Sequence, residues 1–241
     1  MTQEAKTEPL KFYATPPHAC SYLPEETAVT AFVDPDAVLT AGLYSALALH
    51  GFRRSGEHIY RPHCQDCQAC IPVRIPVESF LSAGMSRRFR RIIAANADLS
   101  LHITPKRFDM EHYALYARYI EQRHCDGDMF PPSETQYRNF LLSSWANTEF
   151  VEFRREDRLV AVAVTDVMAN GLSALYTFYD PSEEQRSPGT YAILWQIQEC
   201  QRRGLPHLYL GYYIQNCRKM NYKGSYRPQE LLINGRWTLL R

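Results

Sequence analysis

Three cysteines at a spacing of three, Cys64, Cys67 and Cys70, are the residues whose types and spacing most directly indicate chemistry. Thiolates bind zinc and iron–sulfur clusters, and structural sites of either kind ordinarily take four protein ligands. Cys20, in "HACSYLP", is the leading fourth ligand, and a nearby histidine could replace it in a zinc site. The alternative is a group of free thiols that shapes a loop. The pattern therefore predicts a zinc or iron–sulfur site without excluding free thiols.

A second concentration of reactive residue types lies in "CRKMNYKGSYRP", residues 217–228, where lysine and arginine alternate with tyrosine. Both cations bind carboxylates and phosphates, and arginine does so through a bidentate fork. The alternative is a solvated basic loop whose tyrosines cover a sheet edge. On residue types alone, this segment is a candidate anion-binding site. Its basic and aromatic residues are Arg218, Lys219, Tyr222, Lys223, Tyr226 and Arg227.

The composition places both segments in a globular protein. The 241 residues suffice for one large domain or two compact ones, and 27 Lys and Arg nearly balance 26 Asp and Glu, so any basic surface must be local. No stretch approaches the roughly 20 apolar residues of a membrane span, and the start "MTQEAKTEPLKF" has no signal-peptide core. Seven cysteines without a secretory signal argue against disulfides. We therefore expect a cytoplasmic protein with no membrane partner.

The elements that must position these residues begin with strands and one helix. A helix is predicted from Pro35 to Gly51, and a hairpin in "FRRSGEHIYRP" leads into the cysteines. After the cysteines, "IPVRIPVESF" reads as a strand. Because proline cannot donate to a strand ladder, Pro72 and Pro76 predict an edge or bulged strand. A short basic helix is predicted at residues 86–95.

The rest of the chain is predicted as two helices, an antiparallel meander, a helix, a strand and a closing hairpin. Asp109 and Ser133 are the expected N-caps of the first two helices, and the third begins near Pro188. This order predicts an α+β fold with a mixed sheet flanked by helices. We expect two lobes, a Cys-containing lobe at 1–100 and a second lobe at 101–241.

The crossover before the helix at Pro188 reads "RSPGTY". It resembles the R/Q-x-x-G-x-G/A loop of the GNAT acetyltransferases, in which backbone N–H groups at a helix N-terminus hold a pyrophosphate. Arg186 and Gly189 match this pattern, whereas Tyr191 stands where that superfamily has a small residue. Because Tyr191 would crowd a coenzyme A pyrophosphate, we expect a GNAT-like fold with another acyl donor. Taken alone, the loop is a weak signal and favours an ordinary helix start.

Four segments together resemble one family over nearly the whole chain: the bacterial aminoacyl-tRNA–protein transferases of the N-degron pathway. They are most similar to its leucyltransferase branch, which is related to the eukaryotic arginyltransferases. The resemblance implies transfer of leucine from leucyl-tRNA to an N-terminal Asp or Glu, which marks the acceptor for degradation. It implies no cofactor for the transfer itself. The segments are "HACSYLPEE" (18–26), "HGFRRSGEHIYRPHCQDCQACIPVRIPV" (50–77), "RHCDGDM" (123–129) and residues 172–228.

The implied reaction is aminolysis of an activated ester, so the enzyme must mainly position its partners and stabilise an oxyanion. An acceptor that begins with Asp or Glu also presents a carboxylate, which requires a cation. The resemblance places Lys219, Tyr222 and Lys223 in the substrate cleft, with Tyr226 beside them. Arg74 is a second candidate for the acceptor carboxylate.

A proton acceptor for this reaction is sought at Asp180, which ends "YTFYDP". Tyr176 and Tyr222 complete the predicted catalytic set as hydrogen-bond donors. The alternative for Asp180 is a turn residue, since Asp before Pro commonly ends a strand. An α-amine with a pKa of about 7.7 to 8 is partly neutral at pH 7, so the reaction could also proceed without a dedicated base.

The implied tRNA donor requires a local basic patch, because the whole chain is nearly neutral. The predicted helix "SRRFRRIIAA" supplies Arg87, Arg88 and Arg91. Arg87 and Arg91 share one face, while the isoleucines can dock inward. The alternative is an ordinary charged surface helix.

Three other functions stay open. An arginyl-tRNA–protein transferase of the same fold would need an acidic slot for arginine, where leucine needs an apolar one. A coenzyme A–dependent N-acetyltransferase is disfavoured by Tyr191 and by the basic segments. A metal-bearing RNA-binding adaptor would explain the cysteines and the arginine helix, but it leaves the lysine- and tyrosine-rich segment without a role.

Overall fold

The computed structural model describes residues 9–241, so most of the start "MTQEAKTEPLKF" lies outside the described residues. One sheet holds β1 (Phe12–Ala14), β4 (Thr30–Val33), β5 (Arg53–Ser55) and β6 (His58–Pro62), and a separate pair consists of β2 (His18–Ala19) and β3 (Thr27–Ala28). The large sheet holds β7 (Ile71–Pro76), β8 (Ser100–Pro105), β9 (Thr148–Arg155), β10 (Arg158–Met168), β11 (Gly171–Tyr179), β12 (His207–Tyr213), β13 (Gln229–Ile233) and β14 (Arg236–Leu240). The helices are α1 (Ala41–Ala48), α2 (Val77–Ser82), α3 (Arg87–Ala95), α4 (Met110–Arg123), α5 (Glu134–Leu141), α6 (Pro188–Arg202) and the 3-10 helices η1 (Pro181–Arg186) and η2 (Asn221–Ser225).

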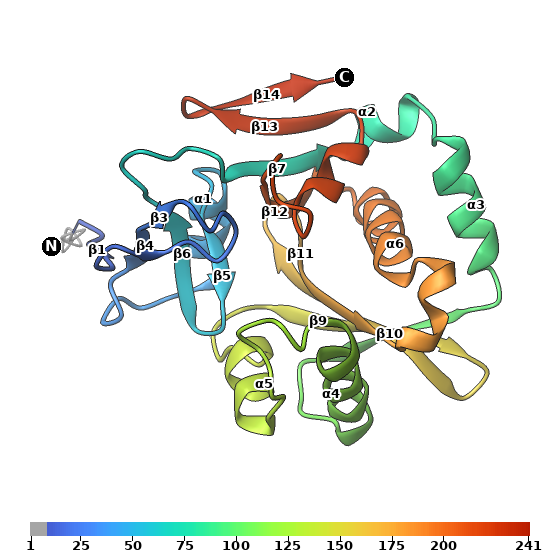
Figure 1. Ribbon diagram of the computed structural model, residues 1–241. Helices are drawn as coiled ribbons and strands as arrows, with labels where there is room; N and C mark the ends of the chain where they lie inside the picture. Colours follow the sequence, from blue (N-terminus) through green and yellow to red (C-terminus); the bar gives the residue numbers. More distant parts are fainter. Residues whose placement is uncertain (1–8) are drawn as a thin grey trace, which may run out of the picture.

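The eight-stranded sheet is the centre of the fold, and the smaller sheet lies beside it (Figure 1). Its strand order is β14-β13-β7-β12-β11-β10-β9-β8. Only β11 and β12 run parallel, and the other neighbours pair antiparallel. The predicted mixed sheet flanked by helices is confirmed. No helix within residues 9–241 is long and apolar enough to cross a membrane.

Alternation along β10 explains why helices cover both faces of the large sheet. Ala161 and Ala163 pack in a cluster that includes Ala192 of α6. Val162 and Val164, which alternate with them, pack in a second cluster with residues of α4 and α5. Because successive side chains of a strand point to opposite faces, α6 lies on one face of the sheet and α4 and α5 on the other.

Most helix starts lie where the sequence predicted them. The Asp109 carboxylate accepts N–H bonds from the first turn of α4, and the Ser133 hydroxyl accepts one from α5. Ser86 caps the basic helix α3 in the same way. Helix α1 begins later than the predicted Pro35, because the Thr40 side chain accepts the N–H of Leu43 and so caps the helix.

Strand β7 lies inside the large sheet, between β13 and β12, so of the two predicted alternatives the edge strand is wrong. The irregular pairing expected of a bulged strand is present in its register with β12. The prolines are tolerated because β13 pairs with β7 only at Val73 and Arg74, leaving Pro72 and Pro76 outside that ladder. The register with β12 also shifts next to this stretch, between Tyr209 and Gly211. A strand before residue 100 therefore belongs to the sheet of the predicted second lobe, and the sheet crosses the expected boundary.

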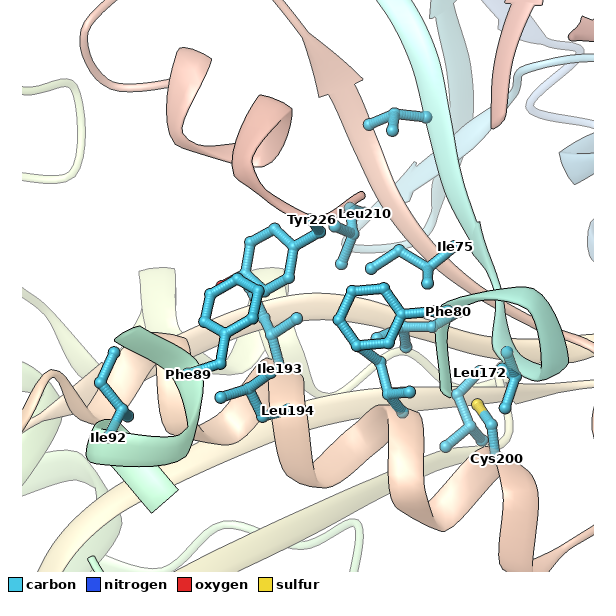
Figure 2. Packing of buried hydrophobic residues seen from close by; sticks show 14 of the residues in the cluster. Ile75, Phe80, Phe89, Ile92, Leu172, Ile193, Leu194, Cys200, Leu210 and Tyr226 are labelled. Carbon is cyan, nitrogen blue, oxygen red and sulfur yellow. The ribbon is translucent and has the colours of Figure 1, made fainter. Parts of the chain in front are cut away.

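A cluster of buried aromatic and aliphatic side chains fixes α3 against α6 (Figure 2). Phe89 of α3 stacks on Tyr226, with ring centroids 5.1 Å apart, and also packs on Phe80 of α2. Asn96, which ends α3, donates to the carbonyl of Arg186 at 2.9 Å. These contacts tie the basic helix to the crossover at the start of α6.

Candidate functional site

A cavity of about 550 Å³ lies where β11 and β12 stop pairing. Their parallel ladder covers Gly171–Ser173 and His207–Tyr209, and both strands continue beyond it. The cavity is lined by these continuing strands and by the start of α6, the end of α4, η2 and the small sheet. Segments from the whole length of the chain thus meet at one hollow.

Arg53 of β5 bridges the two separated strands at the floor of this cavity. Its guanidinium donates to the carbonyl of Leu210 at 3.0 Å on β12, and to those of Ala174 and Leu175 at 2.8 Å each on β11. Gly211 makes room for it: a Cβ there would lie 1.4 Å from Arg53 Nη1, and the φ of Gly211 is +76°. The guanidinium replaces the missing ladder between the strands.

Lys223 of η2 is the second cation of the cavity floor, with 4% of its surface exposed. Its ammonium donates to the Tyr212 carbonyl at 2.7 Å and contacts Met220 Sδ at 3.3 Å. Burial, and then the charge of Arg53, lower the pKa of Lys223 to about 7. Lys223 is therefore a titrating group near neutrality, unlike an ordinary lysine.

The rim of the cavity carries charges that are already paired. Lys219 Nζ lies 3.0 Å from Asp126 Oδ2, and Glu184 Oε1 lies 2.6 Å from Arg123. His124 also lines the cavity, and its Nε2 lies 3.1 Å from the Tyr119 hydroxyl. Burial, and then the charge of Lys219, lower the pKa of His124, so its imidazole is neutral at pH 7.

The structure brings five of the predicted site residues together in this cavity. They come from β11, the start of α6 and the segment around η2. Burial raises the pKa of Tyr176, so its phenol stays protonated and can donate a hydrogen bond. The five are Tyr176, Gly189, Lys219, Tyr222 and Lys223.

Asp180 is not among the residues that line the cavity. Its carboxylate caps η1, accepting from the Ser182 N–H at 3.0 Å and the Ser182 hydroxyl at 2.7 Å. Burial raises its pKa, but the Ser182 hydrogen bonds and the nearby Arg158 and Arg118 outweigh that effect and leave the pKa lowered. This placement fits the alternative of a turn residue and does not support Asp180 as the proton acceptor.

Arg74 also lies away from the cavity. Its Nε is 2.6 Å from Glu230 Oε2, Nη1 donates to the Tyr209 hydroxyl at 3.2 Å, and its guanidinium stacks on Trp237 at 4.2 Å. Because these partners satisfy its charge, Arg74 joins β7 to the C-terminal hairpin. Its predicted contact with an acceptor carboxylate is not supported.

The start of α6 does not form the cradle of free N–H groups that a pyrophosphate requires. Pro188 has no N–H, and the N–H groups of Thr190 and Tyr191 both donate to the Ser187 carbonyl at 3.0 Å. Arg186 pairs with Asp98 at 2.6 Å and with Glu183. The Tyr191 ring packs on Phe153. Thus Pro188 and the two first-turn N–H groups already bonded to Ser187, rather than crowding by Tyr191, argue against coenzyme A.

The remaining predicted residues do not line the cavity. Tyr226 is 1% exposed and belongs to the core beneath α3. Arg87, Arg88 and Arg91 are exposed on α3, while Ile92 is buried. The predicted orientation of this helix is confirmed, and its binding role stays a prediction.

The four predicted metal ligands, Cys20, Cys64, Cys67 and Cys70, line a second cavity of about 410 Å³. Burial, and then the other three thiols, raise the pKa of Cys70 to about 12. Within residues 9–241, however, no three His, Cys, Asp or Glu side chains gather closely enough to hold a metal ion. The residue types suit zinc or a cluster but this arrangement does not, so no step of the reaction is derived through a metal.

Arg53 and His124 were missed from the sequence. Both lie in segments that carried the family resemblance, "HGFRRSGEHIYRP" and "RHCDGDM". Nothing in the local pattern separates Arg53 from its neighbour Arg54, which instead pairs with Asp166 in the core at 2.7 Å. The position of Arg53 relative to β11 and β12 depends on contacts made across more than a hundred residues of chain.

Two family models match the chain. "Arginine-tRNA-protein transferase, N terminus" matches residues 18–91, and "Arginine-tRNA-protein transferase, C terminus" matches residues 111–233. The chain belongs to the arginine-tRNA-protein transferase family. The resemblance inferred from the four segments is thereby confirmed, and the two matches fall on either side of residue 100.

Similar members of this family carry the name of the leucyltransferase branch. An "Aspartate/glutamate leucyltransferase" of Pseudomonas fluorescens is 57% identical over 240 residues, which cover 100% of both chains. Relatives with the same name are 59% identical in Stutzerimonas stutzeri, over 96% of this chain and 97% of the relative, and 58% identical in Pseudomonas paraeruginosa, over 100% of both.

Two solved structures are distantly similar. FemX is 10% identical with a TM-score of 0.46, over 86% of this chain and 81% of FemX. L-PGS from Bacillus licheniformis is 12% identical with a TM-score of 0.46, over 61% of this chain and 46% of that chain. The sequence identity of both is far below the 57% to 59% of the family members.

Proposed function

We propose that this transferase moves leucine from leucyl-tRNA to the N-terminal Asp or Glu of an acceptor protein, which the N-degron pathway then degrades. Relatives 57% to 59% identical over nearly the whole chain are named for this amino acid and these acceptors. The polarity of the first cavity is the structural observation that favours leucine over arginine as the transferred amino acid.

This cavity offers apolar contacts and no free carboxylate. Glu184 is the only carboxylate among its described lining residues, and it is paired with Arg123. An arginine side chain would enter beside several cations with no free anion to receive it, whereas leucine needs only apolar surface. The apolar lining includes Phe140, Leu175, Ile193 and Leu210.

The chemistry is an aminolysis whose atoms balance without a cofactor. The acceptor α-nitrogen attacks the leucyl ester carbonyl carbon, a C–N bond forms, and the C–O bond to the tRNA ribose breaks. The proton lost by the amine ends on the leaving ribose oxygen. His124, neutral in this cavity, is suited to relay that proton, and the protonated phenols of Tyr176 and Tyr222 can donate to the oxyanion.

The exposed arginines of α3 supply the proposed binding surface for the tRNA backbone. Helix α3 is joined to the crossover through Asn96 and Arg186, and residues of that crossover line the cavity. A tRNA held on α3 would therefore have its acceptor end near the ester-binding cavity. A cytoplasmic setting, where aminoacyl-tRNAs are made, is part of this proposal.

The finer features of the fold are also proposals. The strand, crossover helix and parallel strand formed by β11, α6 and β12, with a ladder of only three residue pairs, support a GNAT-like arrangement. The family matches on either side of residue 100 support an N-terminal part and a C-terminal part in the sequence, although they share one sheet. A metal at the N-terminal cysteines rests on residue types alone.

A transfer assay tests the function. The purified protein is incubated with labelled leucyl-tRNA or arginyl-tRNA and with peptides that differ only in an N-terminal Asp, Glu or Ala. We expect labelled leucine on the Asp and Glu peptides, and arginine transfer at least about tenfold slower, since a buried cation would lack a partner. Equal transfer of arginine would contradict leucine specificity, and no transfer from either tRNA would overturn the proposal.

A further inference from the structure

The first cavity contains two cations, the buried Lys223 and the partly buried Arg53, whose charge no described carboxylate balances. Of its four basic lining residues, Arg54 pairs with Asp166 and Lys219 pairs with Asp126. Arg53 and Lys223 remain, and within residues 9–241 no carboxylate oxygen lies within 4.0 Å of either one. Since buried charges in proteins are ordinarily paired, this pair of cations indicates an anionic ligand.

Both cations have more N–H groups than the described residues accept. A guanidinium has five N–H groups and an ammonium three. The described residues accept three of those of Arg53, through backbone carbonyls of Leu210, Ala174 and Leu175. Lys223 has one strong acceptor, the Tyr212 carbonyl, and one weak one, the Met220 sulfur. Fixed carbonyl partners hold the two groups in place while leaving donors for a ligand.

We propose that Arg53 and Lys223 form the subsite that binds the side-chain carboxylate of the acceptor's N-terminal Asp or Glu. This inference rests on the proposed function and replaces Arg74 with a pair inside the cavity. A side-chain carboxylate is the end of a short chain and can reach the floor between β11 and β12. A tRNA phosphate, which continues into a nucleoside on both sides, fits such a floor less well.

The subsite also explains how acceptors that begin with Asp or Glu are distinguished from acceptors that begin with Asn or Gln. An Asn or Gln side chain brings no charge and places N–H donors against two cations, so the site rejects it as well as the apolar residues. An N-terminal Asp or Glu instead balances charge that burial makes costly. Selectivity for acidic acceptors then comes from the floor of the cavity and not from its paired rim.

Lys223 makes this selectivity depend on pH. Its pKa of about 7 means that the ammonium is present below neutrality and is lost as the pH rises through 7. The acceptor carboxylate is ionised throughout that range, because its ordinary pKa is about 4. Carboxylate binding should therefore weaken from pH 6 to pH 8. The titratable and charged groups that face Lys223 are Arg53, Cys70, Cys217, Tyr212 and Tyr222.

The test compares leucine transfer to matched peptides that begin with Asp or Asn, with leucyl-tRNA as donor. Lys223→Met removes the ammonium and keeps a similar volume, so the fold should survive. We expect the ratio of kcat/KM for Asp over Asn to fall about ten- to a hundredfold in this variant, with the Asn rate and the KM for leucyl-tRNA within about threefold of the original. Arg53→Lys, which keeps a charge but loses the planar fork, should lower the same ratio.

The pH dependence gives a second readout that needs no mutation. The Asp-to-Asn ratio should fall more steeply between pH 6 and pH 8 in the original protein than in Lys223→Met, because the α-amine of each peptide titrates in the same way with either protein. Arg61→Met, on the same small sheet but outside this cavity, is the matched control and should keep the original ratio.

The outcomes separate the inference from the proposed function. Transfer to the Asp peptide with an unchanged Asp-to-Asn ratio in Lys223→Met would overturn the carboxylate subsite alone. A rise in the KM for leucyl-tRNA with an unchanged ratio would assign the cations to a phosphate instead and also overturn it. No transfer by the original protein to any peptide would overturn the proposed function, and this inference with it.

Discussion

Arg53 and Arg54 are neighbours in β5 whose side chains point to opposite sides of the strand. Both residues line the cavity, but Arg54 is 1% exposed and binds Asp166 through two N–H bonds of 2.7 and 2.8 Å. Thr148 donates a third bond of 2.7 Å to the same carboxylate. The ion pair between Arg54 of β5 and Asp166 of β10 thus joins the small sheet to the large one.

Asp166→Asn should be strongly destabilising. It leaves the buried Arg54 guanidinium without an anion, which costs about 3 to 5 kcal/mol in comparable buried pairs. Urea unfolding measures the loss. Asp98→Asn, which breaks the pair of Asp98 with Arg186 at a side chain 46% exposed, is the matched control and should cost less than about 1 kcal/mol. If the two variants lost the same free energy of unfolding, the buried pair of Arg54 and Asp166 would not be important for stability.

Helix α3 is the element on which the proposed tRNA binding depends. Its buried side, formed by Phe89 and Ile92, is docked in the core, so its arginines are presented to solvent in a fixed orientation. A fixed row of cations is well placed to contact successive phosphates, and such contacts weaken steeply with salt.

Reversing the charge of Arg87 and Arg91 to Glu should raise the KM for leucyl-tRNA and leave kcat nearly unchanged. The slope of log affinity against log salt should become smaller by about one for each phosphate that the helix no longer binds. Arg236→Glu, at the exposed turn of the C-terminal hairpin, is the control and should change neither value. An unchanged KM in the α3 variant would reject this helix as the tRNA surface.

The elements themselves were largely predictable because their signals are local. The caps Asp109, Ser133 and Ser86, and the alternating apolar residues of the meander, depend only on neighbouring residues. The central place of β7 was not predictable, since its prolines are accommodated by a short ladder with β13, a strand more than 150 residues later. Local rules of strand composition could not include that partner.

At the scale of the whole molecule, the family was predictable and the site only in part. The order and spacing of the four segments were enough to identify the family. Among the predicted site residues, Lys219, Tyr222 and Lys223 line the cavity. Asp180 and Arg74 do not line it, since their residue types suit chemistry while the fold uses them in a cap and in an ion pair. Arg53 could not be chosen, since its carbonyl partner Leu210 lies 157 residues away.

The central claim is that leucine transfer takes place in the cavity between β11, β12 and the start of α6, and a variant that fills it tests this most directly. Gly189 lines the cavity, and a Cβ there would meet only Tyr179 Cε1, at 3.9 Å, so a side chain can be added without backbone strain. Gly42, exposed at the start of α1 and equally free of crowding, is the matched control.

The measurement is single-turnover transfer of leucine from leucyl-tRNA to an Asp peptide by Gly189→Leu and Gly42→Leu, each checked for an unchanged melting temperature. We expect Gly189→Leu to lose at least about a hundredfold in rate, because misplacing the reacting groups by about 1 Å costs that much, and Gly42→Leu to keep the original rate. A folded Gly189→Leu that transfers leucine as fast as the original protein would contradict the account.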